Sequence, residues 1–376
     1  MIAALLWCGC HAVDTSAFPD PPGSSEPVDA DTGGLAGDSV DSGGSGEGID
    51  EESGSLDTGE RASEDSATPD GLHVFEEDDF GRVWSCPEDY RDCVEDYLAL
   101  GTLAAEHARP ISSKDLYDQI DSIAAGEVPL VEESMSSEAL EAVVREGLNI
   151  DFLLDGLDGR KLTVTRIAEI SHSDYTEHQL LFTDPWVGEF FGILLVPTTG
   201  SAPHPVIMTV HGHGQRAESP LDFMFGREYP TQGYAVLSLT YRVMHADSNE
   251  HEVTEALLLS GFTFETLRIY ETLLGLKYLR YREDMGAMGI VAHSGGASAN
   301  NLAMWMESPL SAYVYDLEAT YYGAIGEHLT DEMIPALYPY HLLLNAIDQT
   351  AVPSLVVPYG YAEEFDEIVS FMNAHL

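Results

Sequence analysis

The sequence predicts an α/β fold in which a mostly parallel sheet is covered by helices on both faces. Three observations predict it. From about residue 161, strand-like runs such as "EFFGILLVP" and "PVIMTVHG" alternate with helical patterns. The stretch "EVTEALLLSGFTFETLRIYETLLGLKYLR" has helical spacing, interrupted near Gly261. The strand-like "MGIVAHS" passes through Gly295 and Gly296 into a further helical pattern. Strands that alternate with helices in this way form parallel sheets.

Further strands are expected at "KLTVTRIAEI", "HQLLFT", "GYAVLSLTYR" and "YVYDLEATYYGA". Upstream of them, "CVEDYLALGTLAAEHA", "SKDLYDQIDSIAAG" and "SSEALEAVVREGLN" have helical spacing, with serines placed as N-caps. We therefore expect a helical N-terminal region over residues 71–159 and an α/β core over residues 160–376.

Length and charge narrow the classes of function. The chain has 376 residues, enough for a large core, and a formal net charge of −49. Because such acidity repels phosphates and anionic lipids, we expect neither nucleic acid nor a charged membrane surface as a partner. Residues 11–70 are acidic and rich in Gly, Ser and Pro. Such a segment buries too little apolar surface to fold, and we expect a disordered acidic tether there.

The first ten residues, "MIAALLWCGC", resemble the end of a bacterial export signal. Cys10 follows a glycine, as at a lipoprotein cleavage site, and is a candidate for lipidation. We expect an exported protein, either a cell-envelope lipoprotein or a secreted protein, that contacts a membrane only through this anchor. In that compartment Cys86 and Cys93 are expected to close a small disulfide loop, with free thiols as the alternative.

Ser294 is the strongest candidate for chemistry. It follows a buried-strand pattern, at the carboxyl end where open α/β sheets bind their ligands. The run Ala292-His293-Ser294-Gly295-Gly296 matches a nucleophile elbow in which alanine replaces the first glycine. Small residues are needed because strand and helix pass close together there. The N–H of Gly295 is then a candidate oxyanion donor. The alternative is a strand–glycine–helix turn that carries an incidental serine.

A second glycine turn strengthens this interpretation. The run "PVIMTVHGHG" ends in His211-Gly212-His213-Gly214, whose backbone N–H groups can face the elbow. We expect the N–H of His213 to complete the oxyanion hole with that of Gly295. Metal binding by His211 and His213 is the competing interpretation. No third or fourth ligand is evident, so neither a metal nor another cofactor is expected.

The segments "GILLVP", "VIMTVHGHG", "GYAVLSLTYR" and "MGIVAHSGGASAN" stand in the order found in the α/β-hydrolase superfamily. From about residue 160 to residue 360 the chain resembles that superfamily, and most closely its dienelactone-hydrolase and acetyl-xylan-esterase-like branches. The resemblance implies the α/β-hydrolase fold and no metal cofactor. It also implies a serine nucleophile, a carboxylate and a histidine, in that order along the chain.

The catalytic carboxylate and histidine can be assigned to residues of this chain in two ways. In the first, "PSLVVPYG" is the strand before the acid, and "GYAEEF" resembles the family's G-x-x-D turn. Glu363 is then the acid, with Glu364 and Asp366 as close substitutes. The segment "EEFDEIVSFMNAHL" becomes a helix, the final strand of the family is missing, and His375 is the remaining downstream histidine.

In the second assignment, "YHLLLNAIDQTAVP" is the acid strand with Asp348 as the acid, and Tyr361 stands where a histidine is expected. We prefer the first assignment, because too few residues separate the two runs for a crossover helix. Neither assignment places a histidine where the family has one. Three histidines upstream of these acid candidates, His293, His328 and His341, lie out of family order. Glu327 is a further alternative for the acid.

The sequence thus predicts a serine hydrolase of carboxylic esters, acting on a small-molecule or carbohydrate ester. Ser294 would attack the ester, His375 would carry the proton, and Glu363 would orient that histidine. One alternative is a catalytically inactive surface protein that keeps the hydrolase fold for binding, which the missing histidine position favours. A serine peptidase of the same fold is another.

Overall fold

The computed structural model describes residues 73–79, 107–131, 134–155, 160–241, 250–306, 310–316, 334–344, 352–359, 361 and 363–376. Cys10, Cys86, Cys93, Glu327, His328 and Asp348, and the acidic segment 11–70, lie outside these residues, so the predictions on them stay predictions.

The strands of the sheet are β1 (His73–Asp78), β2 (Lys161–Ser171), β3 (Tyr175–Asp184), β4 (Gly188–Pro197), β5 (His204–Val210), β6 (Ala235–Leu239), β7 (Met285–Ala292), β8 (Leu310–Tyr315) and β9 (Ser354–Val356). The helices are α3 (Ser113–Ala124), α4 (Ser137–Leu148), α5 (Asp151–Asp155), α6 (Glu218–Phe223), η3 (Tyr229–Gln232), α7 (Glu250–Leu259), α8 (Phe264–Tyr281), α9 (Ser294–Ala303), η5 (Tyr338–Tyr340), α10 (His341–Leu344) and α11 (Phe365–His375).

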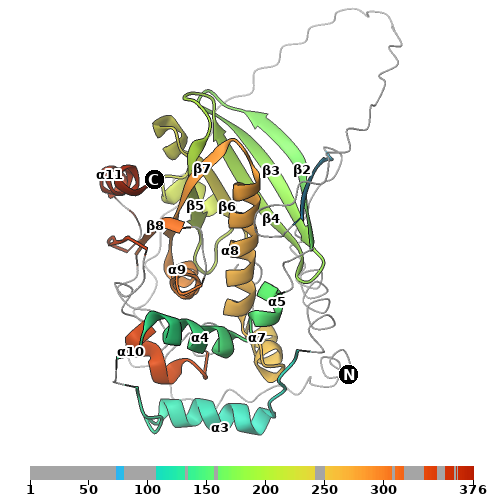
Figure 1. Cartoon of the computed structure of the whole chain (residues 1–376), viewed down its shortest axis with the longest axis vertical. Coiled ribbons are helices and arrows are strands. Elements are labelled where there is room, and N and C mark those ends of the chain that lie inside the picture. Colours follow the sequence, from blue (N-terminus) through green and yellow to red (C-terminus); the bar gives the residue numbers. More distant parts are fainter. Residues whose placement is uncertain are drawn as a thin grey trace, which may run out of the picture. The chain divides into compact units, whose positions relative to one another are not determined.

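One sheet organises the described residues, with the strand order β1-β2-β3-β4-β6-β5-β7-β8-β9 (Figure 1). From β6 to β9 all neighbours are parallel, whereas β2, β3 and β4 form an antiparallel meander and β4 meets β6 antiparallel. The expected mostly parallel α/β sheet is therefore confirmed. Since the parallel strands share one direction, the residues that follow β5, β6, β7 and β8 meet at one edge.

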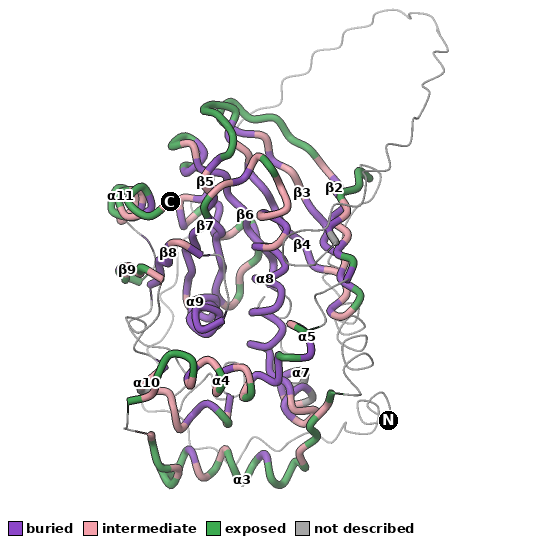
Figure 2. The backbone as a smooth tube through the Cα atoms, in the orientation of Figure 1, coloured by how far each residue is buried: buried purple, intermediate pink, exposed green. Residues whose placement is uncertain are grey.

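Helices cover both faces of the parallel strands, and alternate strand residues divide between them. Met208 of β5 belongs to the core that holds α8 and α9. Its neighbour Ile207 belongs to the core that holds α6 and α11. Figure 2 shows that α8 is buried along most of its length, because sheet, α9 and the helical region surround it. The break near Gly261 is confirmed, since this residue adopts φ 79° between α7 and α8.

The N-terminal part packs onto this core. Leu140 and Val144 of α4 are fully buried in the cluster that also contains Leu302 of α9. Serine N-caps stabilise both long helices here: Ser112 accepts from the N–H of Asp115, and Ser136 accepts likewise in α4. The same part also supplies β1, an edge strand that the sequence patterns do not indicate.

The last described residues follow the first of the two assignments. Ser354–Val356 is a strand, pairs parallel with β8, and is followed by α11. The second assignment is wrong for its described part, because His341–Leu344 is helical and not a strand.

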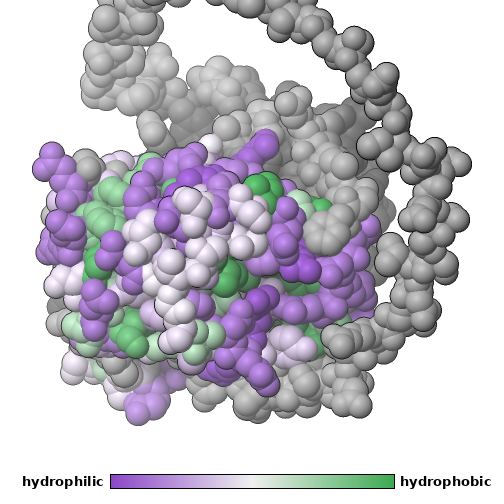
Figure 3. Space-filling model, turned by 90° about the horizontal axis from the view of Figure 1, so that it is seen from above, coloured by the Kyte–Doolittle hydropathy of each residue, from purple (hydrophilic) through white to green (hydrophobic). Residues whose placement is uncertain are grey.

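Hydrophilic side chains predominate on the face in Figure 3, and hydrophobic ones form small separate patches. This agrees with the net charge of −49. Among the helices in the described ranges, none has the length and apolar character that a membrane crossing requires.

Candidate active site

Ser294 lies at the turn from β7 into α9 with a left-handed backbone conformation, φ 49°. His293 before it is still extended, and α9 begins with Ser294 itself. A non-glycine residue in this region costs roughly 1–2 kcal/mol and persists only where its surroundings hold it. This strained strand-to-helix corner has the conformation that the elbow pattern predicts.

Close packing on a neighbouring turn explains the small residues of the elbow. A Cβ on Gly296 would lie 2.2 Å from the carbonyl oxygen of His211, so only glycine fits there. A Cβ on Gly212 would lie 2.7 Å from Ser294 Cβ and 3.0 Å from His293 Cδ2. The two glycine-containing turns after β5 and β7 therefore touch directly at the carboxyl edge of the sheet.

Buried hydrogen bonds hold the first turns of α9 in place. Asn300 donates through Nδ2 to the carbonyl oxygen of Gly296 at 2.8 Å and to the hydroxyl of Tyr241 at 3.4 Å. The hydroxyl of Tyr313, on β8, donates to the carbonyl of Ala297 at 3.0 Å. These contacts tie the helix after Ser294 to β8 and to the segment that follows β6, which keeps the nucleophile candidate in a fixed position.

The glycine turn after β5 is ordered by its own polar groups. The His211 imidazole is fully buried, accepts at Nε2 from the N–H of Tyr241 at 2.9 Å, and has Nδ1 2.8 Å from the carbonyl oxygen of Gly212. Both ring nitrogens thus make backbone contacts, which does not fit the alternative of a metal ligand. The N–H of Gly212 is taken by Gln215 Oε1 at 2.9 Å, so His213 carries the next N–H along this turn.

Gly295 has the position expected of an oxyanion donor. As the second residue of α9, it has no carbonyl four residues earlier within the helix to accept its N–H. The positive end of the helix dipole also favours negative charge at this point. Gly295 and His213 belong to the two turns that touch at Ser294, so the proposed donors come from the same edge of the sheet.

Asp316 is a site residue that the sequence patterns did not single out. It directly follows β8 and is 3% exposed. Its Oδ1 accepts from the N–H of Ser294 at 3.0 Å, and its Oδ2 lies 2.5 Å from His293 Nδ1. Its position in the sequence could have indicated it, because an acidic residue directly after a parallel strand lies at the ligand-binding edge.

Tyr361 closes the other side of the elbow. It is 2% exposed and its hydroxyl donates to the carbonyl of Ala292 at 2.5 Å. Burial, together with the charge of Asp316, raises the pKa of Tyr361 well above its usual value, so the phenol keeps its proton and donates. Tyr361 therefore stabilises the end of β7, and it does not act as a proton acceptor in the place of a histidine.

The structure does not bring His375 to Ser294. Asn373, two residues before His375, accepts a hydrogen bond from the hydroxyl of Tyr234 at 2.7 Å. Tyr234 precedes β6, at the amino end of the parallel strands, whereas Ser294 follows their carboxyl end. About seven strand residues, or roughly 20 Å, separate the two edges. The expectation that His375 serves Ser294 is corrected, because the packing of α11 places this exposed imidazole at the opposite edge.

Glu363 is exposed and lies before α11. Its N–H donates to the carboxylate of Glu364 at 2.8 Å. Among the described residues, no histidine contacts the Glu363 carboxylate or hydrogen-bonds to the Ser294 hydroxyl. The pairing of Glu363 with a catalytic imidazole therefore stays a prediction without a described partner.

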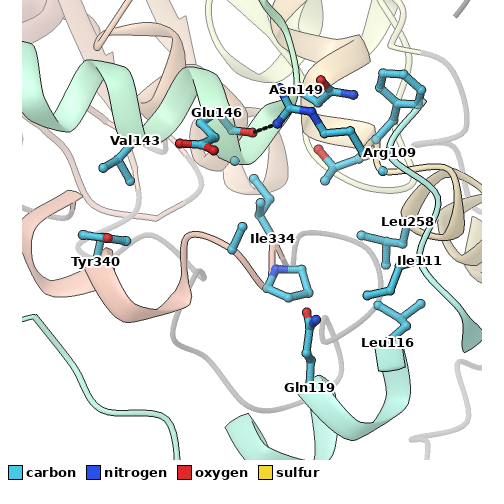
Figure 4. Close-up of a pocket in the computed structure, with 16 residues that line it drawn as sticks. Arg109, Ile111, Leu116, Gln119, Val143, Glu146, Asn149, Leu258, Ile334 and Tyr340 are labelled. Carbon is cyan, nitrogen blue, oxygen red and sulfur yellow. Dashed lines mark hydrogen bonds between the residues drawn. The ribbon is translucent and has the colours of Figure 1, made fainter. Parts of the chain in front are cut away.

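A cavity of about 360 Å³ lies among the helices, away from these residues (Figure 4). Residues of α3 and α4 line it, and Arg109 crosses it to donate to the carbonyl of Glu146 at 3.3 Å. It also reaches Thr263, the N-cap of α8. Thr272, which contacts the sheet edge, lies nine residues further along α8, or about 13 Å. The cavity is therefore separate from the Ser294 site.

The strand order, the helices on both faces and the strained serine at the carboxyl edge define an α/β-hydrolase fold. Comparisons with known proteins agree on this fold. The chain is similar to the structure of a protein assigned as an acetyl xylan esterase from Bacteroides fragilis, with a TM-score of 0.52 and 12% identity over 71% of this chain and 80% of that one.

Two further solved structures have lower similarity. Acetyl xylan esterase 1 from Thermoanaerobacterium sp. has a TM-score of 0.43 and 12% identity, over 65% of this chain and 94% of that one. The acetyl xylan esterase from Paenibacillus sp. R4 has a TM-score of 0.43 and 13% identity, over 69% of this chain and 99% of that one. No protein-family model matches the chain, and no curated protein does.

Proposed function

We propose that the protein hydrolyses carboxylic esters through an acyl-enzyme on Ser294. The observation that carries the proposal is the left-handed conformation of this serine, φ 49°, at a strand-to-helix turn packed against the glycine turn of Gly212. Strain of this kind is stored where a reactive group must be presented. The Bacteroides fragilis protein of similar fold is assigned as an acetyl xylan esterase, which supports an acetylated carbohydrate as the substrate class.

The chemistry follows from the two turns. The Ser294 oxygen attacks the ester carbonyl while a base removes its proton, and a tetrahedral oxyanion forms. The N–H groups of Gly295 and His213 donate to that oxyanion. When it collapses, the alcohol leaves with a proton and the acyl group stays on Ser294, until water repeats the sequence and releases the acid. Each donor is expected to contribute roughly 3–4 kcal/mol of barrier lowering.

A second candidate function is binding without catalysis on the same fold. It is favoured by one observation, that no described imidazole hydrogen-bonds to the Ser294 hydroxyl. A free esterase can show the same feature, because free enzymes often hold these contacts long or misaligned until substrate is bound.

Labelling with a fluorophosphonate probe, together with turnover of p-nitrophenyl acetate, tests the proposal. We expect the protein to label once, at Ser294, and Ser294→Ala to lose both labelling and turnover. Ser298→Ala is the matched control, because it removes a hydroxyl one helical turn further along α9. Equal inertness of the wild type and Ser294→Ala would exclude the esterase and leave the binding function.

A further inference from the structure

We propose that His293, the residue directly before the nucleophile, is the general base of this site, and that Asp316 orients it. The inference rests on the proposed function and names the proton acceptor that it needs. The imidazole lies against the elbow itself, whereas the expected downstream histidine lies at the other edge of the sheet.

The pair has the right chemistry. Asp316 is buried. Its Oδ1 accepts a hydrogen bond from the N–H of Ser294, and its Oδ2 lies 2.5 Å from His293 Nδ1. An ionised carboxylate can only accept hydrogen bonds, so the proton of the neutral imidazole lies on Nδ1. Nε2 then carries the lone pair, which is the tautomer that a general base of serine requires.

The ring is also turned toward the correct place. A Cβ on Gly212 would meet His293 Cδ2 at 3.0 Å and Ser294 Cβ at 2.7 Å, so both side chains border the same face of one glycine. Cδ2 is bonded to Nε2, and together they form the ring edge away from Asp316. That edge therefore lies on the side of the ring that faces Gly212 and the Ser294 side chain.

Aromatic neighbours restrict the imidazole. The ring centroids of Phe223 and Tyr359 lie 4.9 Å and 5.1 Å from that of His293, and that of Tyr361 lies 6.3 Å away. Tyr359 is 66% exposed, so the pair is near solvent on this side. An imidazole held by a carboxylate on one edge and by rings around it keeps a defined orientation, as a base must.

The proton balance of the step is complete. As Ser294 Oγ bonds to the ester carbon, its proton moves to His293 Nε2, and the imidazolium is stabilised by Asp316. As the bond to the alcohol breaks, Nε2 returns that proton to the leaving oxygen. Hydrolysis of the acyl-enzyme repeats both transfers with water as the nucleophile.

Other imidazoles in the described part of the chain fit this role less well. His211 has both ring nitrogens in backbone contacts. His204 begins β5, at the amino edge of the sheet. His213 lies on the glycine turn near Ser294 and is the competing base that an experiment must separate from His293.

The test compares His293→Ala, His293→Gln, His213→Ala, His375→Ala and the control His341→Ala, each assayed for ester turnover and for the rate of fluorophosphonate labelling. We expect both His293 variants to lose roughly 10²–10⁴-fold in turnover, the range that general-base catalysis contributes. Added imidazole should restore part of the rate in His293→Ala, because the free base can occupy the vacated volume. Imidazole should leave Ser294→Ala inert.

The outcomes separate this inference from the proposed function. If the wild type labels at Ser294 and His293→Ala turns over ester at the wild-type rate, the inference is wrong while the esterase stands. A large loss in His213→Ala or His375→Ala with His293→Gln active would overturn it in the same way. If the His293 variants lose activity, unfolding temperatures equal to that of the wild type, together with rescue by imidazole, support the role of His293 as the general base. A loss without rescue in folded protein would instead assign His293 a purely structural role and overturn the inference.

Discussion

The replacement Gly212→Ala tests how the two turns at the site depend on each other. The new Cβ would meet Ser294 Cβ at 2.7 Å, His293 Cδ2 at 3.0 Å and the carbonyl oxygen of His293 at 3.3 Å. Carbon atoms normally approach to about 3.5–4.0 Å. The turn and the elbow must therefore separate by up to about 1 Å.

The expected magnitudes follow from that displacement. Overpacking of this size typically costs about 1–3 kcal/mol of unfolding free energy. Misplacement of a nucleophile by about 1 Å costs on the order of 10²-fold in rate. We expect Gly212→Ala to show both losses, in urea unfolding and in the rate of fluorophosphonate labelling at Ser294.

Gly214→Ala on the same turn is the matched control. A Cβ there meets nothing within 4 Å, but the residue has φ 73°. Its replacement should cost roughly 1–2 kcal/mol through backbone strain alone and retain most of the labelling rate. The reasoning is refuted if Gly212→Ala labels at the wild-type rate, or if Gly214→Ala loses labelling as severely, because contact with the elbow would then not explain the effect.

Three further changes have expected outcomes. Gly296→Ala should destabilise at or above the upper end of about 1–3 kcal/mol in urea unfolding, because its Cβ would meet the backbone oxygen of His211 at 2.2 Å; a wild-type midpoint would contradict the packing. Tyr361→Phe should cost roughly 1 kcal/mol by removing the hydrogen bond to Ala292, and an unchanged unfolding free energy would count against that bond. Burial raises the pKa of Asp184 above its usual value, so the folded state holds this proton more tightly than the unfolded state. The stability that this protonated carboxyl contributes is present below about pH 3.9 and is lost as pH rises through the raised pKa. The unfolding free energy of Asp184→Asn should therefore increase relative to that of the wild type as pH rises. A difference that stays constant with pH would disprove this.

The elements of the core were predictable because their signals are local. The strand before Ser294 is a continuous buried run, and two glycines mark where it turns into α9. The same holds for the strand before Gly212 and for the break at Gly261. Each of these segments carries its periodicity and its turn residues within a few positions, so the local sequence is enough to predict the element.

The partners of Ser294 were not predictable in this way. Asp316 and His293 are separated by 23 positions and meet only because β8 lies beside β7 in the sheet. His375 was assigned from its place in the chain order of the family. The packing of Met372 against Gly289, in the middle of β7, instead fixes α11 away from the carboxyl edge.

By itself, the sequence determined the alternation of strands and helices, the glycine turns, and the serine that stands between β7 and α9. Only the tertiary structure decided which carboxylate and which imidazole lie beside that serine. The physical reason is that periodicity and turn residues are properties of neighbours in the chain. Contacts at a sheet edge depend on strand order and on the direction in which each later helix packs, and neither is written within a short segment.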